Sequence, residues 1–112
     1  MVSDRDDQPW HIELSEEVDE WLQALPVKAQ AIRALDLLAA QGTSLRMPHT
    51  RKLDVDLWEL RFRCKQVNQR ITYTMEPQRR IITITTFRKQ RSNERKEVQR
   101  ARNVLRRHRR KE

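Results

Sequence analysis

The sequence has 112 residues, a formal net charge of +8 at pH 7, one cysteine and one glycine. This length suits one domain with one modest hydrophobic core. A single cysteine excludes an intramolecular disulfide, and a single glycine excludes a glycine-rich phosphate-binding loop. The basic excess favours a polyanionic partner such as nucleic acid.

Charge is divided unevenly between the two ends of the chain. Residues 1–25 hold eight acidic residues and one basic residue, whereas residues 88–112 hold twelve basic and three acidic residues. No segment approaches the roughly 20 apolar residues that span a bilayer, and the first residues lack the pattern of a secretion signal. We therefore expect a cytoplasmic protein with a basic pole and no membrane partner.

The first third of the chain predicts a strand followed by a helix hairpin. Residues 10–14, WHIEL, alternate apolar and polar side chains, as a strand with one buried face does. Ser15 offers a helix N-cap, and acidic residues in the following turn complement the helix dipole. Four apolar residues at i, i+3, i+4 and i+7 from Val18 continue this helix. Pro26 then suits the first turn of a second amphipathic helix, which ends at Gly42.

The rest of the chain predicts a loop, three strands and a basic helix. Residues 41–56 hold turn-forming residues without a period, so we expect a connecting loop. Residues 57–64 and 70–75 alternate apolar and polar side chains, and residues 80–87 are rich in β-branched residues. Short links between these strands suit antiparallel hairpins. From Ser92 a narrow apolar stripe in a basic segment predicts a last helix.

This order predicts an α+β fold, in which an antiparallel sheet carries the helix hairpin on one face and a basic helix follows at the C-terminus. Residues 1–112 should form one domain, with flexible ends at about residues 1–9 and 106–112. The other face of the sheet should be open to solvent. Three arginines of the central strands project there: Arg61, Arg63 and Arg70.

These arginines have a structural explanation and a functional one. An antiparallel sheet with one wet face needs polar residues there, and arginine covers apolar surface with its long stem. Like charges on neighbouring strands repel, however, and Glu59 is the only acid that the pattern assigns to this face in the two central strands. The planar guanidinium also binds phosphate through two nitrogens. The pattern therefore favours a bound anion.

Other residue types give weaker signals. The three histidines lack the spacing of metal ligands, so we predict no metal site. Cys64 lies on the apolar side of its strand and is expected to be a core residue. Trp58 and Phe62 share that side, which favours core packing over stacking on nucleic-acid bases.

Three runs of sequence carry a family resemblance. They are LWELRFR at 57–63, QRITYT at 69–74 and ITTFRKQRSNERKEVQRARNVL at 84–105. In this order and spacing they resemble the RelE/ParE toxin superfamily, and within it the HigB-like, phage-derived branch, over about residues 10–107. The resemblance implies a RelE-like fold and a type II toxin that cuts mRNA on the ribosome and inhibits translation. It also implies a helix-turn-helix antitoxin as partner, and no cofactor.

The resemblance also implies site residues. The arginine of the family's Glu-Leu-Arg motif falls on Arg61, its strand arginine on Arg70, and its basic pair after the last strand on Arg88 and Lys89. Arginine neutralises charge on a phosphorane but, with a pKa of about 12 or higher, cannot be a general base. Glu59 is a possible base with Lys89 as acid, or Glu59 only holds Arg61 in place. Further basic residues are expected to bind RNA: Arg63, Arg46, Arg51, Lys52 and Arg91.

One departure from the family leaves other activities open. Many members have a histidine near the Phe-x-Lys segment, where this chain has Thr85 and Thr86. A site without that histidine would depend on electrostatics and on the ribosome's positioning of the RNA. The alternatives are a ParE-like gyrase inhibitor, a basic module that binds nucleic acid without cutting it, and an inactive toxin that binds only its antitoxin.

Overall fold

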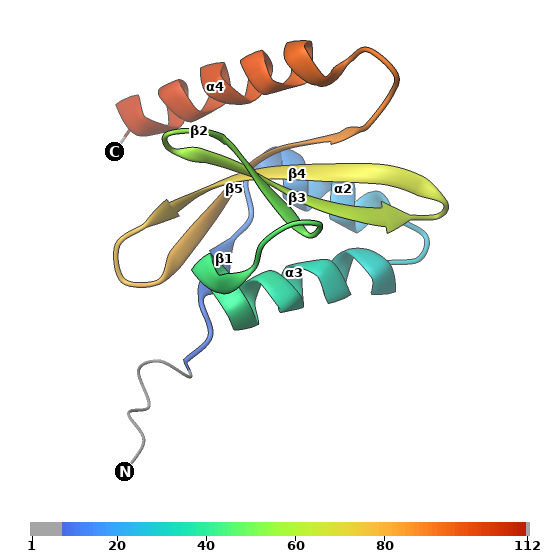
Figure 1. Ribbon diagram of the computed structural model, residues 1–112, viewed down its shortest axis with the longest axis horizontal. Coiled ribbons are helices and arrows are strands. Elements are labelled where there is room, and N and C mark those ends of the chain that lie inside the picture. Colours follow the sequence, from blue (N-terminus) through green and yellow to red (C-terminus); the bar gives the residue numbers. More distant parts are fainter. Residues whose placement is uncertain (1–7, 112) are drawn as a thin grey trace.

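The computed structural model describes residues 8–111, and within them it contains three α-helices and a five-stranded mixed sheet (Figure 1). The α+β fold expected from the sequence is confirmed. The sheet order is β1-β5-β4-β3-β2. The elements in chain order are β1 His11–Glu13, α2 Glu16–Ala24, α3 Ala29–Gln41, the short 3-10 helix η1 Gly42–Ser44, β2 Thr50–Asp54, β3 Leu57–Cys64, β4 Val67–Glu76, β5 Arg80–Arg88 and α4 Glu94–Arg110.

The helix hairpin begins and ends as the sequence predicts. Ser15 caps α2 because its Oγ accepts a hydrogen bond from the Val18 amide at 3.3 Å. Gly42 ends α3 with a φ of 50°, in the left-handed region that favours glycine. A side chain at this position would overlap the indole of Trp10, so the close packing of β1 on α3 also requires glycine.

The sheet differs from the expected one at both edges. β1 pairs with β5 in parallel, whereas β2, β3, β4 and β5 form antiparallel pairs. The loop predicted for residues 41–56 is wrong in its second half, because residues 50–54 form β2 and pair with β3. This edge strand carries exposed polar residues and so lacks the apolar alternation by which a strand is recognised.

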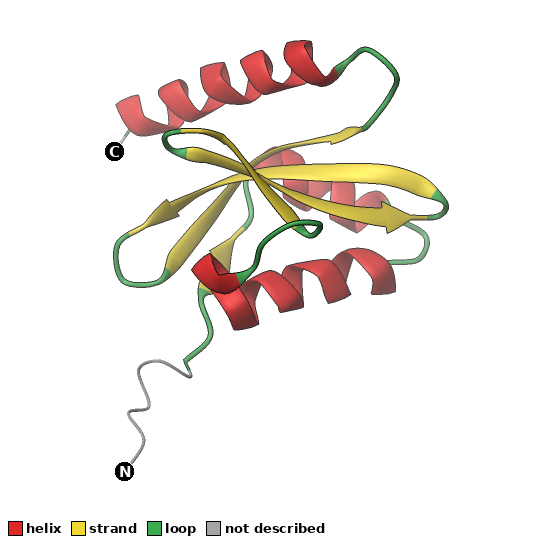
Figure 2. Ribbon diagram, viewed as in Figure 1, coloured by secondary structure: helices red, strands yellow, loops and turns green. Residues whose placement is uncertain are grey.

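Helices cover both faces of the sheet (Figure 2). The hairpin of α2 and α3 packs on the face that carries Leu60, Ile71 and Tyr73, and Trp58 and Phe62 lie against this core as predicted. Cys64 is buried, as expected of a core residue.

Helix α4 packs on the second face through Val98, Ala101 and Leu105, which contact a cluster containing Leu57, Ile82 and Ile84. The prediction of an open second face is therefore wrong. β5 contributes Ile81 to the core under the hairpin and Ile82 and Ile84 to the cluster under α4, so it is covered on both faces.

Helix α4 also extends further than the apolar stripe suggested. It continues to Arg110, whereas the sequence predicts flexible chain from residue 106. Arg109 contributes to this extension, since its Nη1 bonds to the Asp56 carboxylate at 2.8 Å. At the other end, residues 1–7 of the predicted flexible segment lie outside the described residues. No helix in the described part of the chain is long and apolar enough to cross a membrane.

Candidate functional site

Charged side chains from three strands and one helix meet between the sheet and the N-terminal end of α4. Arg51 of β2 pairs in register with Glu59 of β3, and Arg61 of β3 pairs with Arg70 of β4, so these residues share the face toward α4. Glu94, the first residue of α4, approaches the same carboxylate. We call these five residues the acid–arginine cluster.

The cluster is unusually buried for its charge. Glu59 is 1% exposed and Arg70 is 7% exposed, whereas the Arg61 side chain is 27% exposed. The Oε1 of Glu59 lies 3.7 Å from Arg70 Nε and 3.9 Å from Arg61 Nε, so each contact is an ion pair without a hydrogen bond.

Several polar atoms of this cluster have no hydrogen-bond partner. When both acids are ionised, Glu59 Oε2, both carboxylate oxygens of Glu94 and the Nε atoms of Arg61 and Arg70 are buried without a hydrogen-bond partner. Roughly nine in ten buried polar groups in proteins are hydrogen-bonded. The concentration of exceptions at one place marks a site where a ligand's polar atoms would be stabilised.

The electrostatics of the cluster favour a proton shared between two acids. Burial raises the pKa of Glu59, and the adjacent Glu94 raises it further by hydrogen bonding and by repulsion. Arg70 and Arg61 act against these effects, and the resulting pKa of Glu59 is about 7. A carboxyl group with this pKa can accept and release protons at neutral pH.

The arginines of the cluster have distinct roles. Arg70 has a lowered pKa, chiefly because of its burial and also because Arg61 and Arg51 repel its charge, although Glu59 counteracts the effect. Arg61 lies closer to solvent than Arg70 and can reach a ligand. Arg70 therefore lies beside Glu59 in the interior, whereas Arg61 and Arg51 lie nearer to solvent.

One protein family matches most of the chain. The family described as phage derived protein Gp49-like (DUF891) matches residues 20–106. The chain belongs to the Gp49-like family. This is a family of toxins from toxin–antitoxin systems within the RelE/HigB-like superfamily, so an antitoxin protein is its implied partner. The matched range of this Gp49-like toxin includes the whole acid–arginine cluster. No curated protein matches the chain.

The structure places Arg88 on the opposite face of the sheet from the acid–arginine cluster. Arg88 pairs in register with Gln69, one residue before Arg70, and lines a groove with Trp21 on the α2 side of the sheet. Lys89 lies in the loop after β5, where its Nζ donates to a backbone carbonyl at 2.7 Å. Strand alternation explains the position of Arg88, because neighbouring residues of a strand face opposite sides and the preceding residue, Phe87, pairs with Arg70.

The residues predicted to bind RNA are distributed over two surfaces. Arg51 belongs to the acid–arginine cluster, while Lys52 pairs with Trp58 on the opposite face. Arg63 is exposed at the end of β3 and donates to the Gln66 carbonyl at 3.2 Å. The two others, Arg46 before β2 and Arg91 before α4, are exposed loop residues.

The two threonines at the position of the family's histidine have structural contacts. Thr85 Oγ1 lies 2.6 Å from Thr72 Oγ1, and Thr86 Oγ1 donates to the Arg70 carbonyl at 2.8 Å. Gln69 also donates to Thr86 Oγ1, at 2.8 Å. These hydroxyls therefore hold β4 against β5 and fix the backbone of Arg70.

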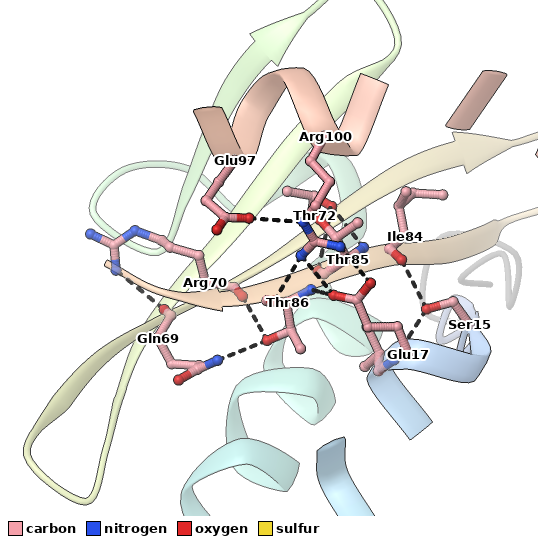
Figure 3. A network of polar contacts seen from close by, with 11 residues as sticks. Ser15, Glu17, Gln69, Arg70, Thr72, Ile84, Thr85, Thr86, Glu97 and Arg100 are labelled. Atoms are coloured by element: carbon pink, nitrogen blue, oxygen red, sulfur yellow. Dashed lines mark hydrogen bonds and ion pairs between the residues drawn. The ribbon is translucent and has the colours of Figure 1, made fainter. Parts of the chain in front are cut away.

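Sequence reasoning missed a second polar group beside the acid–arginine cluster (Figure 3). Arg100 of α4 binds both carboxylate oxygens of Glu17 of α2, at 2.7 and 2.8 Å, and Glu97 at 3.0 Å. It also donates to the Thr86 carbonyl at 3.2 Å, and the Thr86 amide donates to Glu17 at 2.8 Å. We call Glu17, Thr86, Glu97 and Arg100 the edge network.

The edge network completes the exposed side of β5. Within the described residues, β1 pairs only with residues 80–82, so the continuation of β5 lacks a neighbouring strand on that side. Ser15 Oγ donates to the Ile84 carbonyl at 3.0 Å, and Glu17 and Arg100 bond to the amide and carbonyl of Thr86. Side chains thus replace the missing strand and join α2 to α4 around the sheet edge. The only sequence signals were acids in the first turns of α2 and α4.

Proposed function

We propose that this Gp49-like toxin is a ribosome-dependent endoribonuclease that cuts mRNA and thereby stops translation. The observation that supports this activity most is the nearly fully buried Glu59, which has a pKa of about 7 and lies between Arg61 and Arg70. A general base works best when its pKa is close to the working pH.

The proposed reaction uses the RNA's own 2′-hydroxyl as nucleophile. The ionised Glu59 takes the 2′-hydroxyl proton while the 2′-oxygen bonds to the adjacent phosphorus, and the bond from phosphorus to the 5′-oxygen breaks. The proton shared with Glu94 then passes to the departing 5′-oxygen, so the acid pair ends with the proton count it started with. The products are a 2′,3′-cyclic phosphate and a 5′-hydroxyl. Lys89 is the other candidate donor to the 5′-oxygen.

The arginines would stabilise the charge that develops during this reaction. The phosphorane carries more negative charge than the starting phosphodiester, and guanidinium groups held in advance at that position lower the barrier. Arg61 would contact the phosphate, since its side chain is 27% exposed, and Arg51 would add positive charge from the groove wall. Arg70 is a positioning residue because it is 7% exposed and acts through Glu59.

The shape of the site supports a role for the ribosome. The groove of ≈ 320 Å³ between β2 and α4 is lined by Arg51, Glu94 and further basic residues of α4. Glu59 lies beneath its surface, so only a strand bent into one orientation would bring a 2′-hydroxyl to it. If the ribosome holds the mRNA in that orientation, the 2′-hydroxyl is already aligned with Glu59 when the toxin binds, and the reaction is faster.

The test is a translation reaction in which mRNA ends are mapped after adding the wild-type toxin, Glu59→Gln or Glu20→Gln. Glu20 is an exposed acid of α2 and serves as the matched control. Wild type and Glu20→Gln should cut ribosome-bound mRNA and cut free RNA poorly, whereas Glu59→Gln should cut neither. Equal rates on free and ribosome-bound RNA would contradict the ribosome's role. Inhibition of gyrase supercoiling without RNA cleavage would favour the ParE-like activity instead.

A further inference from the structure

A second groove lies on the face of the sheet opposite to the acid–arginine cluster. Its volume is ≈ 530 Å³, and it is bordered by the loop before β2 and by residues of β2, β3 and β4. Trp58 and Tyr73 form its aromatic side, with ring centroids 6.2 Å apart and an interplanar angle of 19°. Met47, on the loop, is 59% exposed. Of the residues that line this groove, the reaction proposed above uses only Arg51.

Positive charge surrounds this aromatic surface. Lys52 Nζ lies 5.4 Å from the centroid of the Trp58 ring, and Arg46 and Arg51 also line the groove. None of the described residues that line it is acidic. Trp58 is only partly buried, unlike Tyr73, which is 1% exposed. An accessible indole among cations matches the flat base and negative phosphate of a nucleotide.

We propose that the Trp58 groove binds an unpaired nucleotide of single-stranded nucleic acid, with the base on the indole and the neighbouring phosphates at Lys52 and Arg46. Proteins that bind single strands combine such stacking surfaces with basic tracks. The identity of the strand as mRNA rests on the proposed function, but binding itself does not. The groove would hold a nucleotide that flanks the cleaved one.

The sheet topology connects the two sites. β2 is the last strand of the sheet, so no strand covers its outer side. Along β2, Arg51 pairs with Glu59 on the cluster face, and the next residue, Lys52, pairs with Trp58 on the groove face. A single-stranded nucleic acid that crosses this edge of the sheet would keep its phosphates beside basic residues from one site to the other.

Occupation of the groove requires Lys52 to move. In the structure its ammonium lies near the indole as a cation–π contact, which is weak at an exposed site. A base that stacks on Trp58 replaces this contact with a stronger one, and the long flexible side chain can turn to a phosphate. Lys52 would therefore contribute in the free and the bound state.

The direct test is photocrosslinking of the full-length wild-type protein. The probe is a 2′-O-methyl RNA of about eight nucleotides that carries 5-iodouracil and has no free 2′-hydroxyl to be cut. After irradiation, mass spectrometry should find the crosslink at Trp58. Crosslinks confined to residues of the acid–arginine cluster or to α4 would overturn the proposal.

Affinity measurements with the same probe provide a second test. Trp58→Leu should weaken binding by about fivefold or more, and Trp58→Phe should retain most of it. Lys52→Gln should weaken binding and reduce the salt slope by about 0.7, the value for one phosphate contact on a single strand. Lys65→Gln, at the opposite end of β3, removes the same charge and should behave as wild type.

The possible outcomes separate this proposal from the proposed function. Circular dichroism shows whether Trp58→Leu is folded. If it is not, the wild-type crosslink and the comparison of Lys52→Gln with Lys65→Gln test the proposed groove without it. Equal affinities of those two variants, without a crosslink at Trp58, would overturn the groove. A crosslink at Trp58 without any mRNA cleavage would sustain the groove and refute the ribonuclease, and the reverse result would do the opposite.

Discussion

Glu59 and Arg70 form an ion pair across β3 and β4 in which both side chains are nearly fully buried, at an Oε1–Nε distance of 3.7 Å. Arg61 shares the same carboxylate oxygen but its side chain is 27% exposed. Two arginines that the sequence pattern places on one face of the sheet therefore contribute differently. Arg70 belongs to the interior of the protein, and Arg61 to its surface.

The first prediction is that Arg70→Ala destabilises the protein much more than Arg61→Ala. Removing one partner of a buried pair typically costs about 3–5 kcal/mol, whereas removing a partner near the surface costs about 1 kcal/mol or less. The loss of unfolding free energy in Arg70→Ala should be smaller at pH 6 than at pH 8, because at pH 6 Glu59 can become neutral by binding a proton. Urea unfolding of both variants at the two pH values measures this difference. Similar small losses in both would show that Arg70 is not held as an interior ion pair.

The second prediction concerns the acid pair. The pKa of Glu59 is raised from 4.5 to about 7, so the folded protein binds more protons than the unfolded chain between these pH values. Its contribution to the free energy of unfolding must therefore decrease as the pH rises through this window. Glu94→Gln removes an adjacent carboxylate, so it should lower the pKa of Glu59 and flatten this decrease.

The measurement is the titration of the Glu59 carboxyl carbon by NMR, with unfolding at pH 5 and pH 8 alongside. A suitable control is Glu16→Gln, because Glu16 is the first residue of α2 as Glu94 is of α4, and both acids complement a helix dipole. The control should leave the Glu59 midpoint unchanged. An unchanged midpoint in Glu94→Gln as well would mean that burial alone raises the pKa of Glu59.

Much of the fold could be predicted because its signals are local. The Ser15 cap, the periodicity that begins at Val18 and the glycine at position 42 each act within a few residues, and the structure confirms them. Edge strand β2 was not predicted, because only one side chain of Thr50–Asp54 is fully buried. The segment is a strand because it pairs with β3. Pairing between strands is a tertiary property, and a polar edge carries little trace of it in sequence.

The candidate site was only partly predictable for a related reason. Alternation along β3 and β4 assigned Glu59, Arg61 and Arg70 to one face, and the register confirms their proximity. It did not show that α4 covers that face or that Glu94 meets Glu59, because the thin apolar stripe of α4 does not indicate which part of the protein the helix packs on. Alternation predicts the face of the sheet on which a side chain lies. Its burial depends on the element that packs on that face.

The third prediction is that the edge network couples α2 to α4. Burial alone would raise the pKa of Glu17, but hydrogen bonds from Arg100 and from the Thr86 amide outweigh it and hold that pKa below its usual value. The stability from this carboxylate should therefore be present above pH 4.5 and be lost as the pH falls through its lowered pKa. Arg100→Met should cost about 1–2 kcal/mol at pH 7, since the pair is bidentate but partly exposed.

A double-mutant cycle of Glu17→Gln with Arg100→Met measures the coupling directly. Asp54 and Arg102 provide the comparison, because their ion pair is also 2.7 Å long but joins the β2 edge to α4 with a single contact. We expect coupling of about 1 kcal/mol for the first pair and clearly weaker coupling for the second, which is exposed to solvent. Equal coupling in both cycles would show that the contacts to β5 add nothing to the pair.

The last prediction concerns the C-terminal end of α4. Removing residues 106–112 deletes five basic residues and one acidic residue, so ribosome association should weaken and depend less steeply on salt. The truncation should also lower the free energy of unfolding by about 1 kcal/mol, because Arg109 bonds to Asp56 at 2.8 Å and lies 3.7 Å from Glu76. A mobile tail would give the weaker ribosome association without the loss of stability.

The variant Arg109→Ala distinguishes the two effects, because it removes these ion pairs and only one positive charge. It should unfold nearly as easily as the truncated protein and bind ribosomes nearly as well as wild type. If Arg109→Ala is as stable as wild type while the truncation is not, other residues of 106–110 hold the helix end in place, and if the truncated protein keeps the wild-type salt slope, recognition depends on the sheet and its loops instead.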